Sequence, residues 1–394
     1  MSSQEYDVVI VGLGGMGSAA AYHLARRGCR VLGLDAYHRG HTQGSSHGRS
    51  RIISEAYREG AEYVPLVQRA YDLWRELEEE SGRSLLTITG RLVIGEQGSS
   101  AVEGALRSAQ QCNLACERLS EEEVADRFPG FRLGEDLVAA FDPRGGILEP
   151  ETCVGAHLDL AAGHGAFLRH SEPVRRWEEG EDVVRVETDR GVYEAETLVV
   201  TAGAWASELL ADLRLPLSVE RVVNVHFESS RPELFALGRC PVYMLQVPEG
   251  IYYGFPSLPE QGLKFGRHDG GEKCTPDTIR REVDPAEVTM LREVLDRYLP
   301  GASGPVKWTL TCMYTMTPDE HFVIDRHPEH DRVVYACGFS GHGFKFTSVV
   351  GEILADLALK GETKHQIGFL SSRRFLSEPF DSKVQDSSWR IEES

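Results

Sequence analysis

Two lysines stand out in a chain that otherwise relies on arginine for positive charge. Only 7 of its 42 basic residues are lysine, and these include Lys264 in GLKFG and Lys345 in GHGFKF. A lysine ammonium is a compact point charge, whereas an arginine guanidinium is a flat fork of donors. Two solvated lysines are the simplest interpretation. Lys345, however, follows Gly341 and Gly343 at the start of an expected helix, whose positive end would face a bound ring.

A lone cysteine is the second candidate for chemistry. Cys312 lies in TLTCMYTMTPDEHF, before a Thr-Pro-Asp-Glu turn, and nothing in this segment explains a thiol. A single cysteine is usually a small, buried apolar residue. The 8 cysteines have neither paired CxxC spacing nor the density of a disulfide scaffold, so we expect a reducing compartment.

The loop HTQGSSHGRSRIISEAY, residues 41–57, brings further polar groups together. His47, Arg49 and Arg51 would lie near a bound cofactor if the loop folds back along it, and Ser45 is a further candidate for binding the cofactor. A plain surface loop is the alternative.

Two other chemistries are disfavoured. His321, His327 and His330 lack the spacing of metal ligands, so we expect no metal. The sequence contains no GxSxG elbow, which argues against a serine hydrolase.

The element that would position these groups is a glycine turn near the N-terminus. Gly12, Gly14 and Gly17 form GxGxxG, between an expected strand at 6–11 and an expected helix at 18–27. Gly12 permits the tight turn, Gly14 lets the backbone approach a pyrophosphate, and Gly17 lets helix and strand pack closely. The helix N-terminus would add free N–H groups for the phosphates.

An acidic residue completes this pattern. Gly28 is placed to end the helix, and Asp35 stands at the carboxyl end of the next expected strand, RVLGL. A carboxylate there accepts both hydroxyls of a ribose and repels a phosphate on it. The sequence therefore predicts FAD or NAD rather than NADP.

Two later segments repeat the strand, turn and helix order. Residues 182–210 predict a hairpin turning at 189–191 and a buried strand at 198–201; residues 332–361 predict a strand at 333–336 and a helix ending at Gly361. We expect an α/β plus α+β fold with a discontinuous, Rossmann-like FAD-binding domain and a substrate domain on a mostly antiparallel sheet. The expected boundaries are 1–85, 146–216 and 319–383 for the first domain, 86–145 and 217–318 for the second, and 384–394 for a tail.

Composition narrows the partners. The chain has 394 residues, 41% of them hydrophobic, and a formal charge of −19, which disfavours nucleic acid and anionic membranes. The short polar N-terminus precedes an apolar run that glycines interrupt, so no signal peptide or membrane span is expected. A cytoplasmic protein with a small-molecule substrate is the prediction.

Several motifs carry a resemblance. GLGGMG, GSSHGRSRII, GIYYGFP, GLKFGRH, CMYTMTPDEHFVIDRHP and GFSGHGFKF occur in order from about residue 6 to 375. The sequence thereby resembles the monomeric sarcosine oxidase family, which includes N-methyltryptophan oxidase and L-pipecolate oxidase. The resemblance implies a monomeric, D-amino-acid-oxidase-like flavoprotein. It would oxidise a secondary amine at its carbon–nitrogen bond with O2 as acceptor, giving hydrogen peroxide and an imine that hydrolyses.

The resemblance also implies roles for single residues. Cys312 would bond covalently to the 8α-methyl carbon of FAD, a reaction of the thiolate that nearby positive charge favours. Lys264 would lie beside flavin N5 and favour electron transfer to O2, since a fixed cation stabilises superoxide. Arg51 would lie against the ring with His47 nearby. Residues lining the substrate pocket would be Tyr253, His268 and Lys345, with Lys345 pairing with the substrate carboxylate.

One departure bears on the substrate. Where close relatives have RIIR, this chain has RIIS, so Ser54 replaces a cation expected to share the carboxylate with Lys345. Losing a charged hydrogen bond costs about 1.5–3 kcal/mol. We expect weaker binding of sarcosine, unless Arg49 compensates. The alternative substrate is a bulkier amine, such as an N-substituted glycine or a fructosyl amino acid.

Three competing functions remain open at this point. A flavin amine dehydrogenase with a non-oxygen acceptor shares the glycine turn, but Lys264 favours an oxidase. An NAD-dependent dehydrogenase leaves CMYT and GFSGHGFKF unexplained. A non-catalytic nucleotide-binding protein would hold a flavin that no amine reduces.

Overall fold

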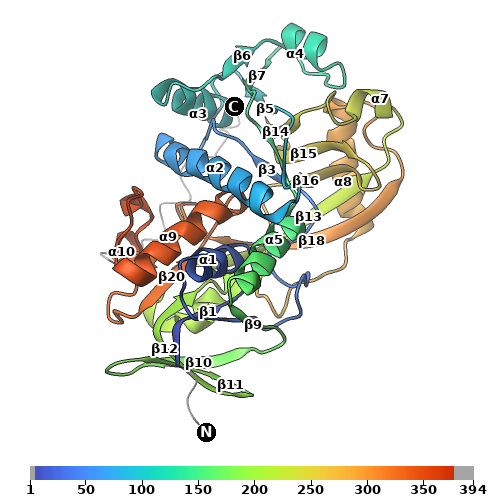
Figure 1. Cartoon of the computed structure of the whole chain (residues 1–394). Coiled ribbons are helices and arrows are strands. Elements are labelled where there is room, and N and C mark those ends of the chain that lie inside the picture. Colours follow the sequence, from blue (N-terminus) through green and yellow to red (C-terminus); the bar gives the residue numbers. More distant parts are fainter. Residues whose placement is uncertain (1–4, 377–394) are drawn as a thin grey trace, which may run out of the picture.

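A computed structural model describes residues 5–376, which form two layers built around separate β-sheets (Figure 1). The tail expected at 384–394 lies outside the described residues. The first sheet has eight strands, and its centre is parallel in the order β9-β2-β1-β12-β20. Its strands are β1 (Glu5–Val11), β2 (Val31–Leu34), β9 (Phe167–Arg169), β10 (Val174–Glu179), β11 (Val184–Thr188), β12 (Gly191–Val200), β19 (Val323–Arg326) and β20 (Val333–Cys337).

Strand β1 is apolar from Val8 to Val11, where both of its faces are covered. Val8 and Ile10 pack in the same core as the apolar faces of the neighbouring helices. Val9 and Val11 pack on the opposite face of the sheet. This confirms the prediction of a buried parallel strand.

Two predicted boundaries differ from the structure. Helix α1 (Gly15–Arg26) begins before the expected Ser18, because the N–H of Ser18 already donates to Gly14 O at 3.0 Å. The first helical turn thus lies inside the glycine motif. The hairpin of β11 and β12 forms as expected, but the strand predicted at 198–201 is the second half of β12.

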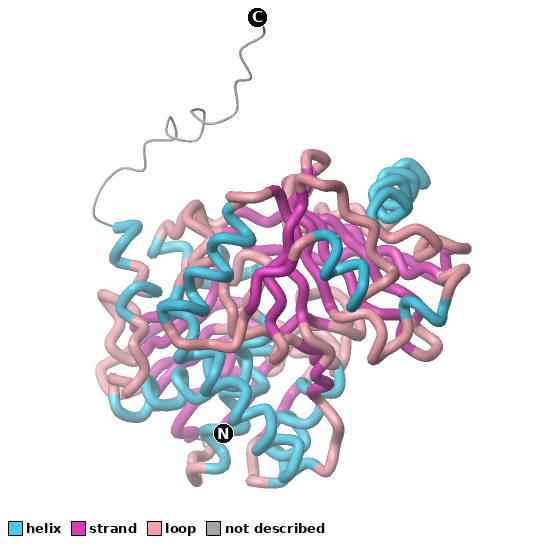
Figure 2. The backbone as a smooth tube through the Cα atoms, turned by 90° about the horizontal axis from the view of Figure 1, so that it is seen from above, coloured by secondary structure: helices cyan, strands magenta, loops and turns pink. Residues whose placement is uncertain are grey.

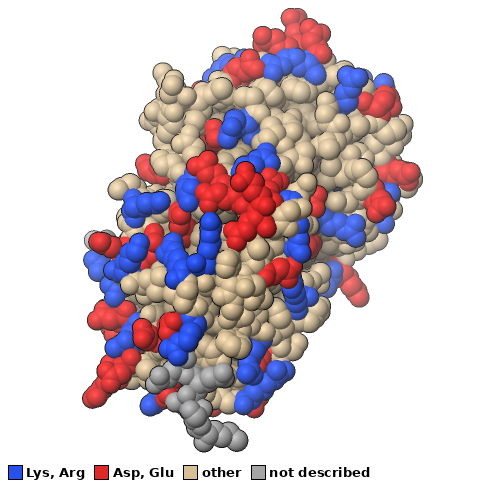
Figure 3. Space-filling view, in the orientation of Figure 1, with Lys and Arg blue, Asp and Glu red and all other residues tan. Residues whose placement is uncertain are grey.

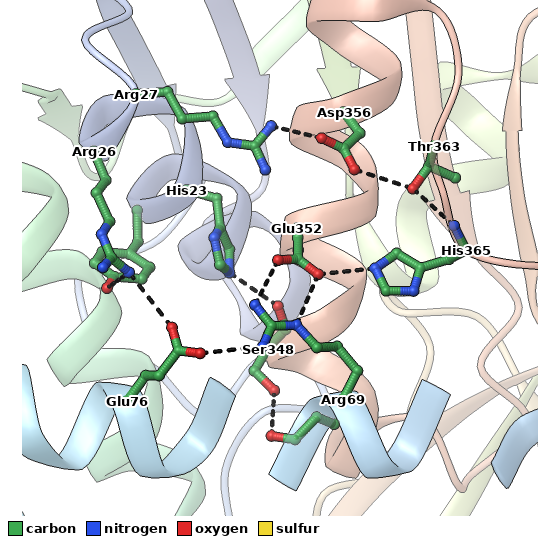
Figure 4. A network of polar contacts seen from close by, with 12 residues as sticks. His23, Arg26, Arg27, Arg69, Glu76, Ser348, Glu352, Asp356, Thr363 and His365 are labelled. Atoms are coloured by element: carbon green, nitrogen blue, oxygen red, sulfur yellow. Dashed lines mark hydrogen bonds and ion pairs between the residues drawn. The ribbon is translucent and has the colours of Figure 1, made fainter. Parts of the chain in front are cut away.

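Helices cover one face of the first sheet (Figure 1). They are α1, α5 (Pro150–Gly163) and α9 (Thr347–Lys360), and α2 (Val64–Ser81) packs on α5 and α9. A polar network joins three of them (Figure 4): Arg69 of α2 donates twice to Glu352 of α9, and Arg27 beyond α1 pairs with Asp356. These bonds hold α9 in place. Lys345 lies in the short turn just before the N-terminus of α9.

The second sheet has nine strands and is antiparallel except for the pair β14–β5. Its order is β18-β13-β16-β15-β14-β5-β7-β6, with β17 beside the start of β13. Figure 2 shows these strands side by side, with helices mostly at the outside. The strands are β5 (Arg91–Glu96), β6 (Glu117–Leu119), β7 (Leu137–Asp142), β13 (Ser218–Phe227), β14 (Val242–Val247), β15 (Gly250–Leu258), β16 (Gly262–Arg267), β17 (Glu272–Cys274) and β18 (Val306–Met316).

A small third sheet joins the two layers. Strand β8 (Gly146–Leu148) pairs antiparallel with β3 (Arg51–Ile53) and with β4 (Leu86–Ile88). The first sheet uses strands only from the segments expected for the nucleotide domain, and the second only from those expected for the substrate domain. The domain boundaries themselves stay a prediction. The remaining helices are α3 (Ser100–Gln111), α4 (Glu121–Arg127), α6 (Ala206–Leu209), α7 (Pro232–Phe235), α8 (Pro285–Tyr298) and α10 (Arg373–Leu376).

The surface carries charges of both signs (Figure 3). Acidic side chains gather near the middle of the face shown, where α2 lies in Figure 1. Within residues 5–376, no helix combines the length and the apolar character that crossing a bilayer demands.

Candidate active site

A cavity of about 580 Å³ lies between the two large sheets. Its walls come from the turn after β1, the end of β2, the loop before β3, strands β14, β15 and β18, and the loop after β20. The predicted residues that line it are Gly12, Gly14, Asp35, Ser45, Arg51, Tyr253, His268, Cys312, Gly341, Gly343 and Lys345. Gly17, His47 and Lys264 are not part of this lining.

The glycine turn is built as the sequence predicts. Gly12 has φ +92°, and a Cβ there would lie 2.5 Å from the carbonyl oxygen of Thr201. A Cβ on Gly17 would lie 1.8 Å from Gly12 O, so this glycine lets helix and strand pack. A Cβ on Gly14 would meet only Ser46 Oγ, at 3.2 Å, so the backbone of Gly14 is open to the cavity.

Asp35 borders the cavity at the end of β2. Its Oδ2 accepts the N–H of Leu13 at 2.8 Å, and its Oδ1 accepts the N–H of Tyr37 at 2.9 Å. Burial raises the pKa of this carboxyl, but His41 at 3.4 Å and the backbone donors outweigh it and hold the pKa below its usual value. The carboxylate is therefore ionised and shares the turn with the glycines.

Three predicted residues meet where the loop before β3 crosses β18. Ser45 Oγ donates to the carbonyl of Met313 at 2.8 Å, and Arg51 Nη2 donates to the carbonyl of Ser45 at 2.9 Å. The same Nη2 lies 3.7 Å from the sulfur of Cys312. A buried thiol and a guanidinium thus face the cavity together, from segments more than 250 residues apart.

Lys264 and His47 lie behind this wall. The ammonium of Lys264 is buried and donates to the carbonyls of Gly48 at 2.9 Å and Ser50 at 3.0 Å. Burial, and then the charge of Arg51, hold the pKa of this lysine well below its usual value. The same two causes, in the same order, lower the pKa of His47 to about 3. At neutral pH His47 is therefore uncharged, Lys264 holds its proton less tightly than a solvated lysine, and Arg51 is the fixed positive charge of this wall.

Aromatic residues form the roof. The hydroxyl of Tyr253 donates to Asn224 Oδ1 at 2.6 Å, and Nδ1 of His268 lies 3.4 Å from the hydroxyl of Tyr314. Burial raises the pKa of Tyr253 and, ahead of nearby positive charges, lowers that of His268 to about 3. Both rings are uncharged at neutral pH.

Lys345 lies at the far end, in the short turn before α9. Its Nζ donates to the carbonyl of His342 at 3.2 Å and lies 4.8 Å from the ring centroid of Tyr57. Burial lowers the pKa of Lys345 to about 7, although Glu59 opposes the shift. This cation titrates in the physiological range.

Sequence reasoning missed Arg91, which lines the cavity from the start of β5. Its Nη1 donates to Ser54 Oγ at 2.6 Å, at the position where a cation was expected. Arginine at the head of the apolar run LVIG in GRLVIG was the available signal.

The compensation suggested for Arg49 is wrong. Its side chain is exposed and does not line the cavity. Its guanidinium lies 5.0 Å from the ring centroid of Trp308, and its backbone N–H donates to Glu151.

One polar cluster has the residue types of a metal site. Within the described chain, ligand atoms of Asp212, His327 and His330 lie within 4.8 Å of one another. The N–H of Glu329 donates to Nδ1 of His327, so the ring proton of His327 sits on Nε2, which lies 2.8 Å from Asp212. A protonated nitrogen offers no lone pair to a metal, and we interpret the cluster as two imidazole rings in ion-pair contact with one carboxylate.

The residues of the cavity fit FAD. The backbone at Gly14 is open to a pyrophosphate, and the N-terminus of α1 faces the same space. Asp35 is an ionised acceptor for a ribose. Farther along, Arg51 and Cys312 border the volume that an extended dinucleotide would reach.

Known proteins are similar over nearly the whole chain. Residues 7–357 match the family described as FAD dependent oxidoreductase. A monomeric sarcosine oxidase of Streptomyces avermitilis is 46% identical over 387 residues, covering 96% of this chain and 100% of that protein. An N-methyl-L-tryptophan oxidase of Yersinia pestis is 34% identical over 374 residues, covering 94% of this chain and 100% of that protein.

Solved structures share the fold. The open form of NikD, an unusual amino acid oxidase essential for nikkomycin biosynthesis, has a TM-score of 0.84 at 26% identity, covering 94% of this chain and 98% of its own. An L-proline dehydrogenase of P. horikoshii has a TM-score of 0.81 at 22% identity, covering 95% and 98%. With the glycine turn and the cavity in agreement, the chain belongs to the family of FAD-dependent oxidoreductases.

Proposed function

We propose that the chain is an oxidase of secondary amines such as sarcosine or other N-alkyl amino acids, producing hydrogen peroxide and an imine that hydrolyses. One observation carries this proposal: a single cavity joins the glycine turn and Asp35 to a region with aromatic side chains and buried cations. The similarity to a monomeric sarcosine oxidase and to an N-methyl-L-tryptophan oxidase supports the substrate class.

The roof of the cavity selects the reactive form of the amine. When bound, FAD supplies the two-electron oxidation of the carbon–nitrogen bond and passes the electrons to O2. Tyr253 and His268 stay uncharged at neutral pH, so they offer no negative charge to an ammonium ion. Burying an unpaired cation there is costly, which favours the neutral amine.

Cys312 would hold the cofactor in this proposal, through a thioether to the 8α-methyl carbon: the S–H bond and one methyl C–H bond are lost, two protons leave, and the two electrons pass through the flavin to O2. The thiol is buried, and Arg51 Nη2 lies 3.7 Å from its sulfur, so a cation stands beside the atom that would form the bond. Acid precipitation tests the bond: yellow colour is expected in the pellet of the wild type and in the supernatant of Cys312→Ser. Colour released from the wild type would exclude the tether.

In this proposal Lys264 favours O2 as the electron acceptor. Nζ of Lys264, held by two backbone carbonyls, lies at the wall that Arg51 shares, and its protonated form would present positive charge there. Such charge stabilises electron transfer to O2. Peroxide release distinguishes an oxidase from a dehydrogenase with another acceptor. We also propose that the protein acts as a cytoplasmic monomer, which sedimentation and cell fractionation check.

An anaerobic absorbance titration tests the function as a whole. Sarcosine, pipecolate, N-methyltryptophan and an N-benzylglycine are added in turn to the yellow protein. Bleaching of the flavin by one of them, followed by peroxide when air is admitted, is expected. A flavin that no amine in the panel bleaches refutes the proposal.

A further inference from the structure

Arg91 is a buried cation that the fold leaves poorly bonded. Its side chain is 5% exposed, and its two contacts are Ser54 Oγ at 2.6 Å and the sulfur of Met244 at 3.7 Å. Its Nε is buried without a hydrogen-bond partner among the described residues, none of which forms an ion pair with it. A buried charge without an anion is costly, so this arrangement needs an explanation.

A second buried arginine of the same sheet shows what a structural role looks like. Arg221 on β13 donates to both carboxylate oxygens of Glu287 and to the carbonyls of Arg280 and Glu282. All of its nitrogens are used, and it does not line the cavity. Arg91 differs in both respects.

A second unpaired cation lies near Arg91. Lys345 is also buried, lines the same end of the cavity and forms no ion pair among the described residues. Glu59 is the carboxylate whose charge raises the pKa of both cations most. It already accepts a hydrogen bond from Arg58 Nε at 2.6 Å. This end of the cavity therefore holds two buried positive charges and lacks an anion paired with either.

We propose that Arg91 is the arginine of the substrate's carboxylate site and binds that group together with Lys345. The cation absent from position 54, just after β3, is supplied from β5, and Ser54 steers it by accepting one N–H. Arg91 still has unused N–H donors, and the fork of a guanidinium suits a planar carboxylate. This inference rests on the proposed function and names its substrate class: amines bearing a nearby carboxylate. Sarcosine binding is then not weakened by Ser54.

The test uses the flavin-loaded protein and a carboxylate that cannot be oxidised. The probe is methylthioacetate, the carboxylate CH3–S–CH2–COO−, in which sulfur replaces the amine nitrogen of sarcosine. It is titrated while the flavin absorbance is followed. Arg91→Met should raise its Kd about 10- to 100-fold. The KM for sarcosine should rise similarly, and that for N-methylbenzylamine, which has no carboxylate, should stay within about twofold.

Controls separate charge from folding. Arg118→Met removes an exposed arginine of the same sheet and should leave every value unchanged. If Arg91→Met does not retain flavin, Arg91→Gln, which keeps a donor for Ser54, takes its place with the same expected loss. A Kd for methylthioacetate within about twofold of wild type, or equal weakening of both amines, overturns the inference. A wild type that binds methylthioacetate but oxidises no amine refutes the proposed function and leaves only a carboxylate-binding site at Arg91 and Lys345.

Discussion

The pH dependence of carboxylate binding follows from the burial of Lys345. Its ammonium has one hydrogen bond, at 3.2 Å, and a ring face at 4.8 Å, which do not replace water, so its pKa falls to about 7. Below that pH the lysine is charged and attracts a carboxylate. Above it the proton is lost, and the Kd should rise about tenfold per pH unit. Between about pH 7 and 9 the total is about 10- to 100-fold, after which Arg91 alone holds the anion.

Methylthioacetate suits this measurement because it contains no titrating amine. Its Kd is determined by flavin absorbance from about pH 6 to 9.5 at constant ionic strength, for the wild type and Lys345→Met. The variant should bind weakly and without this slope. Folding responds in the opposite direction: the unfolded lysine keeps its proton up to about 10.5, so stability should rise with pH between about 7 and 10.5. A wild-type Kd that is flat across the range, or a Lys345→Met variant with the same slope, refutes the reasoning.

Three further predictions concern other parts of the chain. Lys264→Met should slow reoxidation by O2 about 100-fold or more with a much smaller effect on anaerobic reduction, as measured by stopped flow; equal slowing contradicts the role. Glu352→Gln should lower the free energy of unfolding in urea by about 1.5–3 kcal/mol, since it removes the charge of a buried carboxylate that pairs with the half-buried Arg69; an unchanged midpoint would be the contrary result. Gly17→Ala should abolish flavin retention because its Cβ would lie 1.8 Å from a backbone oxygen, whereas Gly163→Ala, with nothing within 4 Å, should retain it.

Local patterns predicted the nucleotide end of the site well. The order of β1, glycine turn, α1 and β2 depends on neighbours in sequence, so periodicity and turn chemistry suffice to place Gly12 and Asp35. The start of α1 was missed because glycine has poor helix propensity, while the packing of α1 on β1 overrides it. The second strand of the hairpin and the later buried strand were predicted separately, but they form one continuous strand, β12.

The substrate end was harder to predict because its contacts are long-range. Arg91 reaches Ser54 only because β5 pairs with β14 and β7, and no spacing in the sequence encodes that approach. Arg49 has the right charge, yet its positive φ of 63° and the bonds of its loop to Glu151 accompany a side chain that lies outside the cavity. Charge type could be predicted from composition, but the direction of a side chain could not.

The interlocked order of the chain bears on when the protein can acquire its cofactor during synthesis. Strand β1 is made first, yet β12 and β20, which complete its side of the sheet, follow nearly 200 and more than 300 residues later. Cys312 and Lys345 leave the ribosome after most strands of the second sheet. A ribosome-bound chain that stops before β18 lacks both Cys312 and helix α9. We therefore expect FAD to bind only after almost the whole polypeptide has left the exit tunnel.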